Sequence, residues 1–169
     1  MNLVLLPLRL GAKDELHPLA QKEGGGGGDE GQRRTGSPIV LDTNIVLDTF
    51  VFNDPAAESV RQALAGQQLD WLATQPMRGE LVRVLAYPKI QARLTFYKLQ
   101  ARDVLASFDQ HSRIVDIAPK ASMTCSDADD QKFIDLAVQH RAMLLSKDNA
   151  VISMRKRLLA HGILAQAAL

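Results

Sequence analysis

Two aspartates stand just beyond short apolar runs whose composition is typical of buried strands. Asp42 follows residues 39–41 directly, and Asp148 lies three positions after residues 143–145. Because the carboxyl ends of parallel strands meet at one edge of a sheet, we expect both carboxylates at that edge. Clustered carboxylates repel one another, and Mg²⁺ or Mn²⁺ relieves this repulsion because hard cations prefer oxygen ligands. The pattern therefore predicts a divalent-cation site that could activate water.

Helical phase adds two further carboxylates to this predicted site. Asp130 precedes two apolar residues of a predicted helix by three and four positions, so it lies on the inward stripe of that helix. By the same test, Glu80 lies at the edge of the apolar face of an earlier predicted helix. An inward carboxylate needs a partner, because burial of an unpaired charge is costly, and a cation would supply one. Asp129 points off the stripe, and Asp135 is expected to face solvent.

Each of these acids, taken alone, also has a structural interpretation. Asp42 and Asp148 are good turn residues, and Asp130 could cap the N-terminus of a helix. Glu80 could pair with one of the two arginines nearest to it on its own helix. The convergence of four acids on one sheet edge favours the metal site over four separate structural roles.

The elements that must position these acids alternate between short strands and helices. Buried strands that alternate with helices are typical of a parallel sheet covered on both faces. The sequence therefore predicts a three-layer α/β/α sandwich with a central parallel sheet. The predicted strands are residues 39–41, 69–73, 114–117 and 143–145, and the predicted helices are residues 56–65, 77–85, 94–108, 133–138 and 151–159.

Composition separates residues 1–37 from the rest of the 169-residue chain. Five consecutive glycines at residues 24–28, flanked by charged residues, are typical of a flexible linker. We therefore expect a flexible, Gly-rich extension over residues 1–37 and one domain over residues 38–169. No apolar run approaches the roughly 20 residues that a membrane span needs, so we expect no membrane partner.

Charge and cysteine content exclude several other kinds of protein. With 20 basic and 19 acidic residues the net charge is +1, so any binding of nucleic acid must use a local patch. The single cysteine, Cys125, excludes an internal disulfide framework and a Cys-rich zinc site. The four histidines are scattered without the spacing of zinc ligands.

At its acidic positions the sequence resembles the PIN-domain family of metal-dependent ribonucleases. The matching pieces are the strand-Asp-Thr-Asn segment at residues 39–44, Glu80 within a helix, DADDQKFIDLA at residues 127–137, and strand-Ser-Lys-Asp at residues 144–148. The resemblance covers about residues 38–159 and is strongest to the toxin components of bacterial toxin–antitoxin systems, the VapC-like ribonucleases. It implies a PIN-like form of the predicted sandwich.

The resemblance also implies roles for individual residues. Ser146 stands where the family usually has threonine, which keeps the hydroxyl, and residues 161–169 do not look like the usual final strand. The positions that match catalytic, metal-binding carboxylates are Asp42, Glu80, Asp130 and Asp148, and Asp127 matches an additional acid of this subgroup. Asn44 and Ser146 match polar positions that orient the first aspartate or a bound water.

The activity that the resemblance implies is hydrolysis of phosphodiester bonds in single-stranded RNA by an endoribonuclease that uses Mg²⁺ or Mn²⁺. It implies a cytoplasmic protein, with a cognate antitoxin and a second copy of the chain as partners. Because an acidic pocket repels RNA, basic residues should flank it. Residues 78–102 hold six basic residues and one acid, with Phe96 and Tyr97 between them to stack on unpaired bases, and residues 155–157 form a second basic patch. The candidate RNA contacts are Arg78, Arg83 and Lys147.

Other functions compete with this one. A non-catalytic PIN-like module could bind RNA or protein without cutting, although such a module has no need of all four acids. A charged helix face is also common without any ligand. A phosphatase of the haloacid-dehalogenase type needs a second aspartate where Asn44 stands in this chain. Metal binding separates the nuclease from the binding module.

Overall fold

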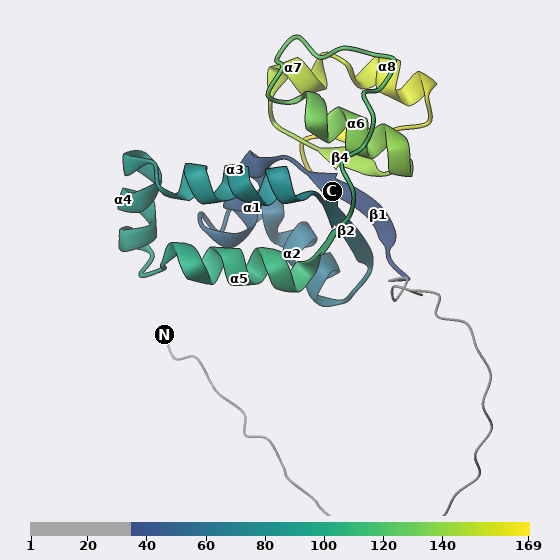
Figure 1. Cartoon of the computed structure of the whole chain (residues 1–169). Helices are drawn as coiled ribbons and strands as arrows, with labels where there is room; N and C mark the ends of the chain where they lie inside the picture. Colours follow the sequence, from purple (N-terminus) through teal and green to yellow (C-terminus); the bar gives the residue numbers. More distant parts are fainter. Residues whose placement is uncertain (1–34) are drawn as a thin grey trace, which may run out of the picture. The chain divides into compact units, whose positions relative to one another are not determined.

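Five short parallel strands form the centre of the computed structural model, which describes residues 35–169 (Figure 1). They lie in the order β3-β2-β1-β4-β5, so the first strand of the chain is the middle strand of the sheet. Every neighbouring pair is parallel, which confirms the predicted sheet. The strands are β1 (Ser37–Leu41), β2 (Leu69–Ala73), β3 (Ser112–Ile114), β4 (Met143–Leu145) and β5 (Ala165–Gln166).

Two groups of helices cover the two faces of this sheet, in the predicted three-layer arrangement (Figure 1). Right-handed crossovers that move across a sheet in opposite directions use opposite faces, which separates the two groups. The first group is α1 (Thr43–Phe50), the 3₁₀ helix η1 (Pro55–Ala57), α2 (Glu58–Ala65), α3 (Gln75–Leu85), α4 (Pro88–Phe96) and α5 (Ala101–His111). The second group is α6 (Gln131–His140), α7 (Asn149–Ile152) and α8 (Arg155–Ala160).

The chain reverses its direction across the sheet next to β1. It runs outward through β2 to β3, then returns and adds β4 on the other side of β1. In open α/β sheets, such a reversal opens a crevice at the carboxyl ends of the two neighbouring strands. The last paired residues of β1 and β4 are Leu41 and Leu145. The residues that follow them therefore emerge side by side at this crevice.

Apolar side chains fill the space between the sheet and both helix layers. On the first face, Trp71 of β2 is 1% exposed, and its ring lies 6.0 Å from Phe50 and 4.8 Å from Phe108. On the second face, Phe133 and Ile134 of α6 are fully buried. This packing holds in place the two strands that end at the crevice.

Several predicted elements differ from the structure. The predicted helix 94–108 is interrupted, because the chain turns between α4 and α5, where Lys98 has a φ of 57°. The predicted helix 151–159 is likewise divided into α7 and α8. The third strand begins earlier than predicted, because Ser112 aligns with Trp71 and the chain leaves the sheet after Ile114. Helix α1 has no separate signal in the apolar pattern, since it begins directly after Asp42.

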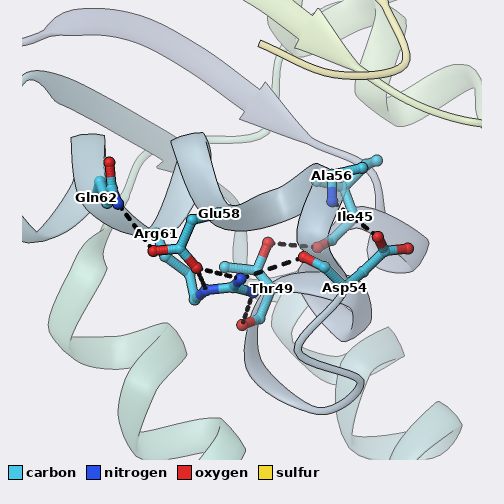
Figure 2. Close-up of polar contacts among 7 residues, drawn as sticks. All are labelled: Ile45, Thr49, Asp54, Ala56, Glu58, Arg61 and Gln62. Atoms are coloured by element: carbon cyan, nitrogen blue, oxygen red, sulfur yellow. Dashed lines mark hydrogen bonds and ion pairs between the residues drawn. The ribbon is translucent and has the colours of Figure 1, made fainter.

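Polar contacts fasten the end of α1 to α2 (Figure 2). Arg61 of α2 pairs with Glu58 at 2.5 Å. Its guanidinium also donates to the backbone oxygens of Thr49 at 3.3 Å and Asp54 at 3.2 Å. The segment that follows α1, including Phe52, is therefore anchored to the helix layer.

The expected division of the chain at residues 37 and 38 falls at the edge of the described part, because residues 1–34 lie outside it. Strand β1 begins at Ser37. Among the helices of residues 35–169, none has the length and apolar character needed to cross a membrane.

Candidate metal centre

Ser146 joins the two aspartates that follow β1 and β4. Asp42 caps α1 and Asp148 caps α7, each through a side-chain oxygen that accepts from the backbone two residues on. The Ser146 hydroxyl donates to Asp42 Oδ2 at 2.6 Å and accepts from the backbone nitrogen of Asp148 at 3.1 Å. Because Ser146 is fully buried, this bridge fixes both aspartates relative to the sheet.

Three carboxylates converge at the crevice. One oxygen each of Asp127, Asp130 and Asp148 lies within 4.8 Å of the other two. Asp127 and Asp130 come from the turn that opens α6, and Asp148 comes from the end of β4. Asp130 is only 9% exposed, and no hydrogen-bond donor reaches its Oδ2 among the described residues. A buried carboxylate oxygen without a donor, beside two further carboxylates, fits the oxygen ligands that Mg²⁺ or Mn²⁺ prefers.

Burial and neighbouring charge hold a proton on Asp130. Burial is the largest cause, and the charges of Asp42, Asp148 and Asp127 add to it, so the pKa of Asp130 is raised to about 7. The ammonium group of Lys132 opposes this rise in the pKa. The group is therefore largely protonated below neutral pH when no cation is bound.

Asp42 lies deeper than the three converging acids, at 4% exposure. Burial raises its pKa, and the hydrogen bonds from Ser146 and from the backbone nitrogen of Asn44 oppose the rise. The charges of Asp148 and Glu80 raise the pKa further. Asp42 therefore lies within electrostatic reach of Asp130 and Asp148, and Glu80 within reach of Asp42, although neither Asp42 nor Glu80 has an oxygen in the closest group.

Glu80 reaches the crevice from α3 and contacts both helix layers. Its Oε1 accepts from the Thr43 hydroxyl at 3.0 Å, and its Oε2 pairs with the ammonium group of Lys132 on α6. Lys132 also donates to the backbone oxygen of Asp129 and lies 4.7 Å from the centre of the Phe133 ring. The partner of Glu80 is therefore this lysine rather than an arginine of its own helix. Sequence reasoning missed Lys132, because no spacing rule connects residues of two separate helices.

The loop before α6 is tied to the helix by two polar residues that sequence reasoning did not select. Gln131 accepts from the backbone nitrogen of Cys125 at 2.7 Å and donates to the backbone oxygen of Met123 at 3.0 Å. Asp135 accepts from the backbone nitrogen of Ala121 and from the Gln131 amide, both at 2.8 Å. The expectation that Asp135 faces solvent is wrong, because the loop folds back over the helix. These contacts position the turn that carries the acids of α6.

The three residues predicted to contact RNA differ in their surroundings. Arg78 makes two hydrogen bonds of 2.7 Å to Asp109. Lys147 pairs with Asp48 at 2.6 Å and with Asp54 at 3.2 Å. Arg83 is exposed, and within residues 35–169 it has no ion pair.

Asn44, the other predicted supporting residue, contributes its backbone nitrogen to Asp42 at 3.4 Å, while its side chain is exposed. Ser146 has the stronger role in this geometry, since its hydroxyl contacts both strand-end aspartates.

The Ser146→Ala variant is expected to bind Mn²⁺ at least tenfold more weakly than the wild type, because a hydrogen bond to a buried charged group contributes roughly 1.5–3 kcal/mol. Loss of the hydroxyl also raises the pKa of Asp42 further, so the loss of affinity should be larger at low pH. Calorimetric titrations with Mn²⁺ at pH 5.5 and pH 8 check both effects. Ser153→Ala is the matched control, because that exposed hydroxyl contacts only the backbone oxygen of Ala150. Equal effects of the two variants would remove the positioning role of Ser146.

Comparisons with known proteins place this fold among described families. Residues 38–150 match the family described as the PIN domain. Among solved structures, a chain of VapBC2 from Rickettsia felis, crystallised with a DNA fragment from its promoter, is similar to this chain with a TM-score of 0.54. The two are 16% identical, over 76% of this chain and 98% of that one, a likeness that concerns the fold alone. A comparison with curated protein sequences finds no match.

Proposed function

This chain belongs to the PIN domain family, and from that premise we propose that it is a divalent-metal-dependent endoribonuclease. Its substrate in this proposal is single-stranded RNA, and its reaction is hydrolysis of a phosphodiester bond. The observation that carries the proposal is the convergence of Asp127, Asp130 and Asp148 within 4.8 Å, where no donor from residues 35–169 reaches the buried Oδ2 of Asp130.

The three converging carboxylates would hold Mg²⁺ or Mn²⁺, and Asp42 and Glu80 would complete the negative surroundings of the ion. A cation at this place supplies a Lewis acid for water and for the phosphate. The donor set consists of carboxylates only, which suits a hard cation better than zinc or copper. No histidine or cysteine belongs to the group among the described residues.

The remaining residues prepare these carboxylates for their task. Ser146 holds Asp42 and Asp148 in register, so both strand ends present their oxygens to the same space. Asp130 would hold the cation as a carboxylate and would release its proton to solvent, because metal ligands must be deprotonated. Lys132 holds Glu80 between α3 and α6, which leaves the negative charge of the site concentrated on the aspartates.

We extend the proposal to the biological role of a toxin component of a bacterial toxin–antitoxin system. Support comes from membership of the PIN domain family and from the structural likeness to a VapBC2 chain. In this proposal the nuclease domain is residues 38–169, the partners are a cognate antitoxin and a second copy of the chain, and the reaction takes place in the cytoplasm.

The proposal is tested with a 5′-labelled single-stranded RNA, the full chain, and either Mn²⁺ or Mg²⁺. We expect endonucleolytic products that disappear when EDTA is added and return when Mn²⁺ is restored in excess. Cleavage that persists in EDTA would contradict a metal-dependent reaction. The absence of both cleavage and metal binding would favour the non-catalytic binding module.

A further inference from the structure

Five basic side chains between Glu80 and Asp103 form no ion pair with a carboxylate within residues 35–169, whereas five other basic residues of the structure do. No aspartate or glutamate occurs in the sequence between those two acids. Arg61, Arg78, Arg113, Lys132 and Lys147 all pair with carboxylates. Within residues 35–169, no ion pair neutralises the cationic segment, which consists of Arg83, Lys89, Arg93, Lys98 and Arg102, all exposed. This segment therefore presents a local positive field on a chain whose net charge is only +1.

Exposed aromatic rings accompany this cationic segment. Tyr87 is 56% exposed, Phe96 is 73% exposed and Tyr97 is 38% exposed. Phe96 and Tyr97 meet edge to face with their ring centres 5.0 Å apart. Exposed aromatic rings among unpaired cations suit a single-stranded nucleic acid, because bases stack on the rings while phosphates contact the cations.

A pocket of about 340 Å³ lies between α4 and the anchored segment that follows α1. Its lining combines two cations, one turn of α4 apart, with three apolar or aromatic side chains. The volume falls in the range of small-ligand pockets, so one nucleotide can enter it. The lining residues are Phe52, Lys89, Ile90, Arg93 and Tyr97.

The elements that form this pocket begin at the metal centre. Helix α1 starts directly after Asp42 and has 8 residues, so its far end lies about 12 Å from the acids. Helix α3 carries Glu80, and α4 follows at its far end (Figure 1). Arg83 comes three residues after Glu80 on α3, so it lies on the same face of that helix and nearer to α4. A single-stranded RNA bound at the acids can thus follow this face of the helix for a few nucleotides.

We propose that the cationic segment and its aromatic rings bind single-stranded RNA beside the scissile bond, with one nucleotide held in the pocket of α4. In this arrangement a base packs against Tyr97, and the adjoining phosphate lies between Lys89 and Arg93. The inference rests on the proposed nuclease function and specifies where its substrate extends. It also replaces Arg78 and Lys147 as RNA contacts, because both are held by aspartates.

Binding of a fluorescein-labelled 12-nucleotide single-stranded RNA in EDTA tests the proposal without cleavage. The Lys89→Ala/Arg93→Ala double variant is expected to bind at least tenfold more weakly than the wild type. Its affinity should also depend less on salt, with a slope of log K against log[salt] smaller by about 0.7, because one phosphate is no longer neutralised. The matched control is Lys156→Ala/Arg157→Ala on α8, which removes two exposed cations from the other helix layer and should change affinity less than twofold.

A second measurement separates failure of this inference from failure of the nuclease proposal. Hydrolysis of bis(4-nitrophenyl) phosphate with Mn²⁺ requires only the acidic centre, so the α4 double variant should retain wild-type rates. RNA affinity that is equal in the wild type and the α4 variant, or equally weakened in the α8 control, would overturn the inference. In that case the aromatic surface would instead serve a protein partner. Absence of phosphodiester hydrolysis in the wild type would contradict the nuclease proposal itself.

Discussion

The Asp42→Asn variant is expected to cleave single-stranded RNA at least 100-fold more slowly than the wild type at saturating Mn²⁺. Asp42 is the most buried acid of the centre, and its charge acts on Asp130 from within the low-dielectric interior. Removal of one preorganised charge from such a site commonly costs about 10²–10³ in rate. The amide oxygen can still accept from Ser146, so the fold should persist, and circular dichroism together with single-turnover cleavage rates checks both points.

Asp129→Asn is the matched control for this prediction. Asp129 lies in the same turn as Asp127 and Asp130, but it is exposed, and its contacts to Asp127 and Lys132 use the backbone. This variant should cleave RNA within about twofold of the wild type. Equal losses in the two variants would show that total negative charge, rather than the arrangement of the centre, controls the rate.

The Asp130→Asn variant is expected to be more stable than the wild type in EDTA at pH 8. Because the folded-state pKa of Asp130 is about 7 and the ordinary value is 3.8, the folded state binds this proton more tightly than the unfolded state. The free energy of unfolding of the wild type therefore falls as pH rises from about 4 to 7. Asparagine removes this loss, so the variant should gain on the order of 2 kcal/mol at pH 8 and little at pH 4.5.

An excess of Mn²⁺ should narrow this difference in stability at pH 8. A ligand that binds only the folded state stabilises it by about 2.7 kcal/mol at 100 times its Kd, and the variant lacks one ligand. Thermal unfolding at pH 4.5 and pH 8, with EDTA and with Mn²⁺, measures all four conditions. A variant less stable than the wild type in EDTA at pH 8 would show that Asp130 has a structural partner instead of a strained charge.

The acids of the site could be predicted because their positions follow from short-range regularities. Asp42 and Asp148 follow apolar runs, and parallel strands bring their ends to one edge. The helical phase of Asp130 placed it inward, which its 9% exposure confirms. The first rule needs only the direction in which the parallel strands run, and the second needs only the periodicity of the helix. The resemblance to the PIN domain family added Asp127, which the structure places with Asp130 and Asp148.

The pairing of charged side chains could not be predicted in the same way. Lys132 meets Glu80 and Arg78 meets Asp109 across separate helices, so these pairs depend on how the layers pack. Arg78 and Lys147 were plausible RNA contacts because they stand beside the predicted acidic site in the sequence. Their actual partners, Asp109 for Arg78 and Asp48 with Asp54 for Lys147, lie far from them along the chain. The break between α4 and α5 also depends on a single residue with positive φ, Lys98, which carries no glycine signal. Tyr97, which lines the pocket of α4, directly precedes Lys98 at this break.

The measurement that tests the central claim most directly is a calorimetric titration of the metal-free full chain with Mn²⁺ at pH 7.5. The account predicts saturable binding by the wild type and by Asp129→Asn, and at least tenfold weaker binding by Asp130→Asn. It also predicts release of protons on binding, seen as a heat that varies with the ionisation enthalpy of the buffer. Absence of binding by the wild type, or equal affinities of the Asp129→Asn and Asp130→Asn variants, would contradict the assignment of these carboxylates as a metal centre.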